Sequence, residues 1–440
     1  MLTDMDLYII KEHIADAKEQ INKMLEAEQY FMNTKEDDKI NHDFFALQIN
    51  EKVDYLLGKD PTIQCENRAY IDAFLNCFDK DFLGQMQEIA TDASIKGITW
   101  LQAYINLQGE LKFMCIPAEE IIPVWTDKTH KKLDKVIRYY PIEKYEGTYK
   151  KVIWKLEIYD DKYCYFYEEV DGQIRIDAEK YFNIGEGQEH SHFYLNGVGY
   201  GMGRPPFIPI KNNLREKSDL DSIKDLIDAY NDNRTREDEA LEDFKNFLVN
   251  VKNYSGDEDN AKSLKQMLES RMIFTDGDGG VEILTPKIDN TANSSHNQTL
   301  KDDIILFGQS VDRNKQINGA AASGVALKAL YTGLDLKCNQ LERQLNKAID
   351  ELEYYLKSYL RLLGHSVSDV DNIALVFNRD ISINETEAVE MCKNSIGVIS
   401  KETVVANHPF VTDLDKELKR IADEDKASFD YAKQVMSNEE

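Results

Sequence analysis

The sequence predicts an α+β protein of several domains, in which amphipathic helices accompany a central run of β-strands. Three observations support this class. Apolar residues recur at spacings of three and four near the N-terminus, β-rich runs begin at Gly97, and a long helical apolar stripe covers 327–362. The chain has 440 residues. At ~100–200 residues per domain, this length predicts roughly two to four domains.

The composition indicates a folded and strongly acidic protein. The chain carries 53 Lys and Arg against 80 Asp and Glu, a net charge of −27. This balance disfavours non-specific capture of nucleic acid by a basic surface, so any contact with DNA is expected to be local. The 42% of hydrophobic residues and the 9 prolines fit a helix-rich globular chain better than a disordered one.

The cysteines and the N-terminus bear on the cellular compartment. Six scattered cysteines form no CxxC pair, which predicts free thiols and neither a zinc site nor a disulfide framework. The first residues are acidic and contain no apolar core, so no secretory signal is expected. No window approaches the ~20 apolar residues that span a bilayer. We therefore expect an intracellular protein with no membrane partner.

Apolar spacing predicts three helices in the N-terminal part. The first contains a stripe of six residues at helical spacing: Leu7, Ile10, Ile14, Ala17, Ile21 and Met24. The second covers 44–57 and ends at Gly58, and the third covers 67–95.

From Gly97 the pattern becomes typical of β-strands. A Gly-centred turn at 108–109 separates 100–107 from 111–116, and further strands are predicted at 136–140, 152–159, 163–170 and 173–176. Aromatic residues crowd 154–167, and such residues can form a base-stacking surface. Because aromatic residues are common in strands, packing within a sheet is the favoured interpretation.

The glycine-rich segment 197–203 resembles a nucleotide-binding loop only superficially. A dinucleotide site needs a helix directly after its glycines, and here Pro205 and Pro206 follow. The sequence GxxxxGK[ST] occurs nowhere, so the chain has no ATPase site of this type.

Two helices and an intervening segment are predicted between 218 and 311. The first helix, over 220–248, is ~45 Å long and apolar at both ends but polar at 231–237. Such a helix suits packing against identical neighbours or a crossing between domains. The turn Asp276, Gly277, Asp278, Gly279 and Gly280 resembles a calcium loop, but Lys287 stands where the twelfth-position carboxylate belongs. A hairpin turn between 272–275 and 281–285 is therefore favoured, and a shorter helix follows at 298–311.

The C-terminal part contains the longest predicted element. Residues 312–324 combine cations and amides with a small-residue tail, and the stripe that follows predicts one helix ending at Gly364. Coiled-coil pairing or packing against neighbouring chains is the expected role of that stripe. A β-run at 374–383 and helices at 385–395 and 411–432 complete the chain.

No catalytic constellation stands out. His190 and His192 lack a third metal ligand nearby, and neither GxSxG nor HExxH occurs. Pairs of carboxylates carry no information in a chain with 80 of them. We expect no enzyme activity, no metal and no cofactor.

Several segments, in order, resemble the portal protein family of tailed bacteriophages, in its siphophage-type branch. The resemblance extends over nearly the whole chain, and its specificity lies in the ordered set. The segments are 50–59 (NEKVDYLLGK), 97–101, 109–111, 116–123 (IPAEEIIP), 206–213 (PFIPIKNN), 218–220, 227–230, 241–244, 323–328 (SGVALK) and 408–413 (HPFVTD).

The resemblance implies a portal fold and its division along the chain. On the family's pattern the wing, of helices plus a β-sheet, covers 1–217, and a stem helix covers 218–248. A small α/β clip covers 249–297, and a second stem helix covers 298–311. The channel loop covers 312–324, a long wing helix covers 325–363, and a mainly helical crown and C-terminal tail cover 364–440.

The resemblance also implies a function and partners. The protomer would form a ring of about twelve copies at one capsid vertex, through which the terminase motor packages double-stranded DNA and from which the genome is later ejected. Its partners would be the terminase large subunit, the major capsid and scaffolding proteins, a head-completion or adaptor protein, and the DNA. It would reside in the virion, and in the host cytoplasm during assembly.

Two candidate sites follow from this map. DNA contact is expected on the channel loop, at Arg313, Asn314, Lys315, Gln316 and Asn318, although a solvated connector remains an alternative for this loop. Partner docking is expected at the clip tip, at Asp276, Gly277, Asp278 and Gly279. Another phage minor head or structural interaction protein remains an alternative function, and a monomeric acidic hydrolase is a third.

Overall fold

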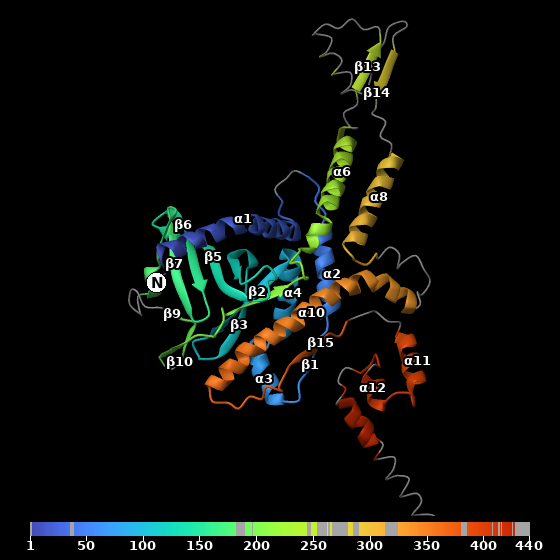
Figure 1. Ribbon diagram of the computed structural model, residues 1–440. Coiled ribbons are helices and arrows are strands. Elements are labelled where there is room, and N and C mark those ends of the chain that lie inside the picture. The colour runs from blue at the N-terminus through green and yellow to red at the C-terminus, as the bar shows by residue number, and fades with distance from the viewer. Residues whose placement is uncertain are drawn as a thin grey trace, which may run out of the picture.

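The computed structural model describes most of the chain as an α+β protein with a compact body, a projecting two-helix stem and a separate C-terminal helical group (Figure 1). The described residues are 2–35, 39–181, 190–195, 197–243, 248–252, 262, 265, 280–284, 290–312, 324–379, 385–406, 408–411, 414, 416–424 and 426.

The larger sheet of the body has six strands. It runs β4 (Ile121–Trp125), β5 (Leu133–Glu146), β6 (Tyr149–Tyr159), β7 (Tyr163–Val170) and β8 (Gln173–Ile176), and β9 (His190–Ser191) also pairs with β7. All the pairings are antiparallel. The helix α1 (Asp4–Met32) packs its stripe on this sheet, because Ile10 is buried against Ile137, Leu156 and Ile158. The predicted role of the aromatic run in sheet packing is confirmed at Tyr165 and Tyr167, which are buried in the same cluster.

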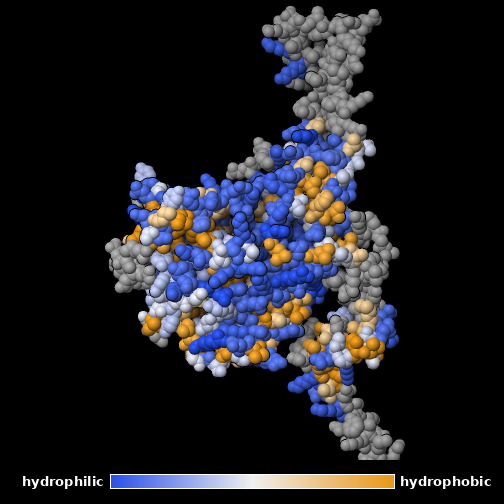
Figure 2. All heavy atoms as spheres, viewed as in Figure 1, coloured by the Kyte–Doolittle hydropathy of each residue, from blue (hydrophilic) through white to orange (hydrophobic). Residues whose placement is uncertain are grey.

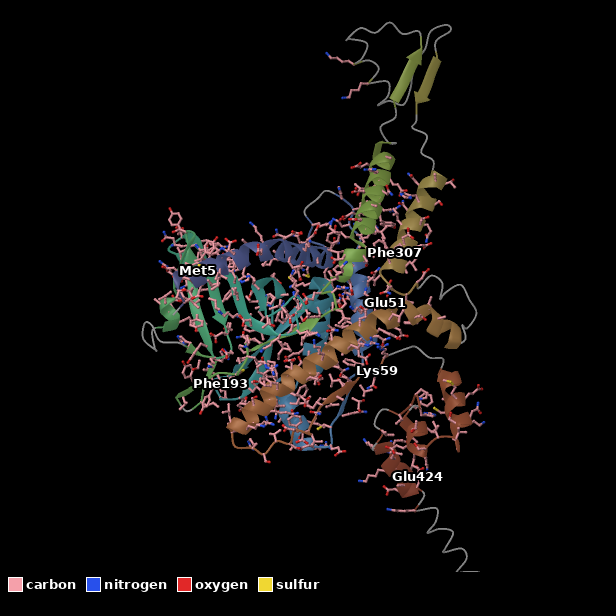
Figure 3. The ribbon with its side chains drawn as sticks, viewed as in Figure 1. Met5, Glu51, Lys59, Phe193, Phe307 and Glu424 are labelled. Atoms are coloured by element: carbon pink, nitrogen blue, oxygen red, sulfur yellow. The ribbon has the colours of Figure 1, made fainter. Side chains whose placement is uncertain are left out.

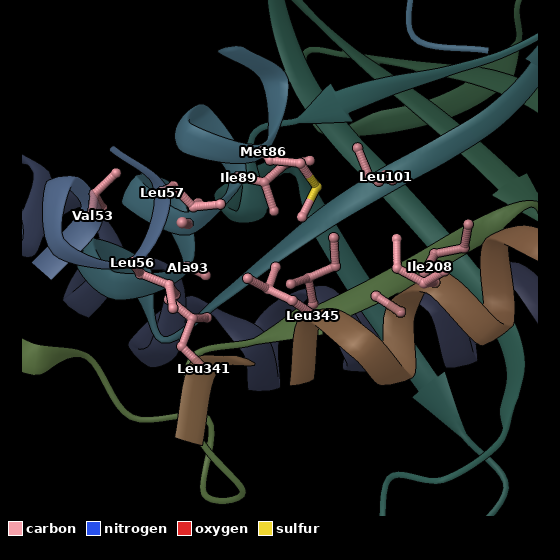
Figure 4. Close-up of a cluster of buried hydrophobic side chains, with 14 of the residues drawn as sticks. Val53, Leu56, Leu57, Met86, Ile89, Ala93, Leu101, Ile208, Leu341 and Leu345 are labelled. Carbon is pink, nitrogen blue, oxygen red and sulfur yellow. The ribbon is translucent and has the colours of Figure 1, made fainter. Parts of the chain in front are cut away.

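The second part of the body is a helical layer on a three-stranded sheet. The sheet order is β12 (Phe207–Lys211), β2 (Ile98–Ile105) and β3 (Leu111–Ile116). Against it pack α2 (Phe44–Leu57), α3 (Arg68–Asn76), α4 (Phe82–Lys96) and the 39-residue α10 (Gly324–Leu362). Figure 4 shows Leu341 and Leu345 of α10 facing Leu56, Ile89 and Leu101 of these elements.

The remaining elements of the body are short. They comprise two 3-10 turns, η1 (Ala118–Glu120) and η2 (Asp219–Ser222), the helix α5 (Ala178–Tyr181), the pair β10 (Phe193–Leu195) and β11 (Val198–Tyr200), and the pair β1 (Thr62–Gln64) and β15 (Ala374–Val376). The pairing of β1 with β15 joins distant parts of the chain.

The stem consists of α6 (Lys224–Asp243) and α8 (Asn290–Phe307), which lie side by side and project from the body (Figure 1). Beyond them β13 (Leu248–Lys252) pairs with β14 (Gly280–Leu284). At the opposite end lie α11 (Glu385–Ser395) and α12 (Lys401–Ala406). Among the described residues, no helix is long and apolar enough to cross a membrane.

Three predicted helix bounds are wrong, each for a local reason. The predicted helix 67–95 is two helices, because Asp79 and Lys80 adopt positive φ angles of 51° and 65° and interrupt it. The helix 220–248 is shorter, since Leu248 already begins β13. The helix 298–311 begins at Asn290 and ends at Phe307, because its first turns are polar and give no apolar signal.

The expectation that the long stripe needs a neighbouring chain is also wrong. From Leu334 to Leu356 the apolar face of α10 is buried inside its own chain, in the main hydrophobic cluster. Figure 2 shows the outer face of α10 as a mainly hydrophilic band. The body therefore has a complete core of its own.

Candidate functional site at the stem root

The predicted channel loop lies largely outside the described residues, which include the segments on either side of it. Arg313, Asn314, Lys315, Gln316 and Asn318 lie outside the described residues, and so do the clip-tip residues Asp276, Gly277, Asp278 and Gly279. The described residues nearest to the loop are Val311 and Asp312 on its N-terminal side and Gly324, the first residue of α10, on its C-terminal side. The site that the structure defines is therefore the root of the stem, which holds the entry end of the loop and the part of α10 around Lys337.

A fully buried lysine lies at the centre of this root. Lys52 of α2 is 0% exposed, and its Nζ donates hydrogen bonds to Ser94 Oγ at 2.9 Å, Asn212 Oδ1 at 2.6 Å and Asp219 Oδ2 at 2.9 Å. Burial lowers the pKa of the Lys52 ammonium, and the carboxylate of Asp219 opposes this effect. All three protons of the ammonium thus have acceptors, as a buried charge requires.

Asp219 is the shared acceptor of two lysines. Its Oδ2 also accepts Lys337 Nζ of α10 at 3.1 Å, and its Oδ1 accepts Asn212 Nδ2 at 2.8 Å. Burial alone would raise the pKa of the Asp219 carboxyl, but Lys337 and Lys52 lower it to about 2. One carboxylate in η2, where the chain turns into α6, therefore connects α2 with α10.

The same elements hold the end of α8. Lys337 Nζ donates to the Gly308 carbonyl at 2.9 Å, and Gln48 Nε2 donates to the Ile304 carbonyl at 3.1 Å. The Gly308 carbonyl lies just past the last turn of α8, and the Ile304 carbonyl, which already accepts the Gly308 amide at 3.0 Å, gains a second donor. A Cβ at Gly308 would lie 2.1 Å from Gln48 Oε1, so a larger residue at this position would displace the Gln48 side chain.

The entry end of the channel loop is held at α2, and on the exit side α2 contacts α10 only from Asp335 onward, about three turns after Gly324. The Val311 amide donates to Glu51 Oε2 at 3.1 Å, and Figure 3 shows Glu51 just below Phe307, the last residue of α8. On the exit side, Tyr55 Oη donates to Asp335 Oδ1 of α10 at 2.8 Å. Arg379 binds the same carboxylate at 2.7 Å, which ties the chain beyond β15 to α10.

This arrangement fixes α2, η2, α10 and the end of α8 relative to one another but offers little for bond-making chemistry. Burial raises the pKa of the Cys338 thiol beside Lys52 to about 12, so it is not a thiolate at neutral pH. The pKa of His192 is lowered by burial, and its ring binds backbone atoms of Tyr163 and Met202. In the described part of the chain, no group of three His, Cys, Asp or Glu residues is placed to hold a metal ion.

Comparison with known proteins identifies the class. The family described as "Phage portal protein, SPP1 Gp6-like" matches residues 2–429. The chain therefore belongs to this family of phage portal proteins, and its role is that of a portal in the phage capsid. The family is one of structural assembly proteins.

Two curated relatives are named portal proteins. The portal protein of Bacillus phage SPP1 is 31% identical over 421 residues, which are 95% of this chain and 82% of the relative. The portal protein of Clostridium phage phiCD119 is 27% identical over 407 residues, covering 89% of this chain and 85% of the relative.

Two solved structures are more distant. A chain from the neck of an empty gene transfer agent (GTA) particle has a TM-score of 0.49 at 12% identity, covering 82% of this chain and 89% of its own. A chain from the virion of a native GTA particle has a TM-score of 0.48 at 11% identity, covering 87% and 91%.

The root network was missed from the sequence, although one signal pointed to it. Lys52 follows Ile49 by three residues and precedes Leu56 by four, so it falls on the apolar stripe of α2. A lysine in such a stripe predicts a buried partner carboxylate, because an ammonium is rarely buried unpaired. Which of the 80 acidic residues supplies that partner depends on the fold.

Proposed function

We propose that the chain forms a ring of about twelve copies at one capsid vertex and acts as a passive conduit for double-stranded DNA. The observation that carries this proposal is the polar two-helix stem, whose root is held by a buried ion network close to the entry end of the predicted channel loop. Membership of the portal family supports it.

The charge of the stem and of the chain supports a channel rather than a binding site. Between Lys224 and Asp243, α6 carries eight acidic and three basic residues, a net charge of −5. Such a wall repels phosphates and lets DNA pass without adhering. Arg313 and Lys315 would attract phosphates instead, and their weak and salt-sensitive contacts would guide the moving duplex.

The same proposal assigns the partners. A separate terminase large subunit supplies the ATPase, since the sequence has no Walker motif. The clip around Asp276 to Gly279 docks terminase first and a head-completion or adaptor protein later, and the wing contacts major capsid and scaffolding proteins. The protein catalyses no reaction, assembles in the host cytoplasm and remains at the portal vertex of the virion, where it also serves genome ejection.

The ring is tested by native mass spectrometry of the purified chain, which should show a closed multimer of about twelve copies. A spectrum with monomer only would contradict the ring. The guiding role of the loop is tested by Arg313→Ala with Lys315→Ala, which should leave the ring intact and lower the packaging rate or the packaged DNA length.

The matched control removes two lysines from the C-terminal part, Lys416→Ala with Lys419→Ala, and should have the smaller effect. Equal packaging by the loop variant and the unmodified protein would mean that the loop is a connector only.

A further inference from the structure

A cluster of cations in the described body lines a hollow beside α10. This basic groove has a volume of about 350 Å³ and lies between the turn that joins β4 to β5, the segment 203–211 and α10. Its cationic residues are Lys131, Lys132, Arg204, Lys211 and Lys347, with His130 beside them and Glu351 as the carboxylate. Arg204 is paired with Glu351, and Lys211 Nζ is paired with Glu216 Oε1 at 2.7 Å just outside the lining, so the unpaired positive charge is that of Lys131, Lys132 and Lys347.

The floor of the groove is preformed. The Arg204 guanidinium lies 3.4 Å from the ring centre of Tyr354 and forms an ion pair with Glu351. Gly203 makes this approach possible, because its φ is 74° and a Cβ there would lie 2.9 Å from Tyr354 Oη. The glycine-rich motif that resembled a nucleotide loop thus serves to seat Arg204 on α10.

The rim, in contrast, carries three lysines, one of which, Lys131, also attracts the nearby Asp127 carboxylate and helps to lower its pKa. Lys131, Lys132 and Lys347 are exposed, and in the described part of the chain their side chains form no hydrogen bond or ion pair. In a chain with an excess of acidic residues, three such lysines around one hollow indicate a surface prepared for an external anionic group.

The shape and the aromatic walls favour an acidic protein surface over nucleic acid. His130 stacks on Trp125 at 4.9 Å between ring centres, and Arg204 covers Tyr354, so these rings are already occupied by the protein's own side chains. Base stacking needs a free aromatic face. The hollow is at the lower end of the ~300–1,000 Å³ range of ligand pockets and therefore admits a few side chains, not a duplex.

We propose that the basic groove receives Asp or Glu carboxylates of a second copy of this chain, and so forms one side of the contact between neighbours in the ring. This inference rests on the proposed ring. Chains of net charge −27 repel one another as a whole, and a ring of identical copies needs a local attraction at each contact. Head-to-tail contacts in a ring are heterologous, so a basic groove on one flank can meet an acidic surface on the other.

The direct test is zero-length crosslinking of rings made from a mixture of ¹⁴N- and ¹⁵N-labelled chains. A carbodiimide joins only lysines and carboxylates that touch. We expect mixed-isotope crosslinks from Lys131, Lys132 or Lys347 to an Asp or Glu of another copy. Rings that yield mixed-isotope crosslinks elsewhere but none from these three lysines would overturn the inference.

A charge-reversal variant tests how much the groove contributes to ring stability. Lys131→Glu with Lys132→Glu should lower the fraction of chains in rings by at least about tenfold, because like charges would then face each other across the contact. The control, Lys80→Glu with Lys162→Glu, makes the same change of net charge at two other exposed lysines and should leave the ring fraction within about twofold. Unchanged circular dichroism and melting of the dissociated variant would show that folding is intact.

Three other outcomes would each contradict either this inference or the proposed function. Intact rings of the groove variant that retain less DNA would overturn the inference in favour of nucleic acid, and intact rings that fail to enter capsids would overturn it in favour of another acidic protein. Absence of rings from the unmodified chain would instead contradict the proposed function. The two failures are therefore distinguishable.

Discussion

The body and the stem of this protein are stabilised in different ways. In the body, α10 buries Leu341, Leu345 and Leu352 to at most 1% exposure against helices and strands of its own chain. In the stem, no side chain from 232 to 240 is buried, and α8 has only Asn297, Leu300 and Ile304 buried within its described length. The body is therefore complete as a monomer, whereas the stem has almost no core and depends on its root and on what surrounds it.

The exposed apolar side chains indicate which parts of the molecule are expected to be covered on assembly. Leu306 and Phe307 are 68% and 56% exposed at the stem root, and Met391 and Val398 are 51% and 81% exposed in α11 and the turn after it. Figure 2 shows apolar patches at both of these places. Monomeric proteins rarely leave such residues in contiguous patches, so the stem root and the C-terminal helices are the parts that assembly is expected to cover.

The largest effect is expected from breaking the root network that joins the two regions. Asp219→Ala would leave Lys52 and Lys337 buried without their carboxylate, and removal of one partner from a buried ion pair costs about 3–5 kcal/mol. Urea unfolding of the isolated chain should show this loss in the free energy of unfolding. The exposed neighbour Asp221 is the control, and Asp221→Ala should change it by less than about 0.5 kcal/mol.

A matched pair of leucine substitutions tests the comparison itself. Leu345→Ala in the body should cost about 2–5 kcal/mol, because it opens a cavity in a closed core. Leu300→Ala in the stem should cost less than about 1 kcal/mol, since the stem opens locally before the body unfolds. Tryptophan fluorescence suits this measurement, because Trp100, Trp125 and Trp154 all lie in strands of the body. Equal losses would mean that stem and body unfold as one unit.

A smaller effect is expected from acid. The pKa of Asp219 is about 2 in the folded chain, below its ordinary value of 3.8. Its ionised form therefore stabilises the fold above pH ~4, and this contribution disappears as the pH falls from about 4 to 2. The difference in unfolding free energy between the unmodified chain and Asp219→Asn should narrow over this interval. A constant difference would show that the charge of Asp219 contributes nothing to the network.

The sequence predicted the body better than the stem for a physical reason. The stripes of α1 and α10 and the hairpin at Gly109 follow from burial patterns and turn chemistry, so their bounds were close to the observed ones. The start of α8 is a polar run at Asn290 whose partner is α6, through Asn297 Nδ2 and Glu237 Oε1 at 2.7 Å. Such contacts leave no periodic signal in the sequence.

The candidate sites, too, could be predicted from the sequence only in part. The family resemblance supplied the channel loop and the clip, but the ion network around Asp219 joins Lys52 to residues as far along the chain as Ser94, Asn212 and Lys337. The basic groove likewise joins a turn, a glycine-rich segment and a helix that are separate in the chain. Both depend on tertiary placement, which spacing alone does not reveal.

Hydrogen–deuterium exchange tests the central claim most directly, because it compares the two regions in the ring and in the monomer released by dilution. We expect amides of α4 and of the middle of α10 to be protected in both states, whereas amides of α6 and α8 should be protected in the ring and exchange at least about tenfold faster in the monomer. Equal protection of α6 and α8 in ring and monomer would contradict the claim that the stem depends on its neighbours.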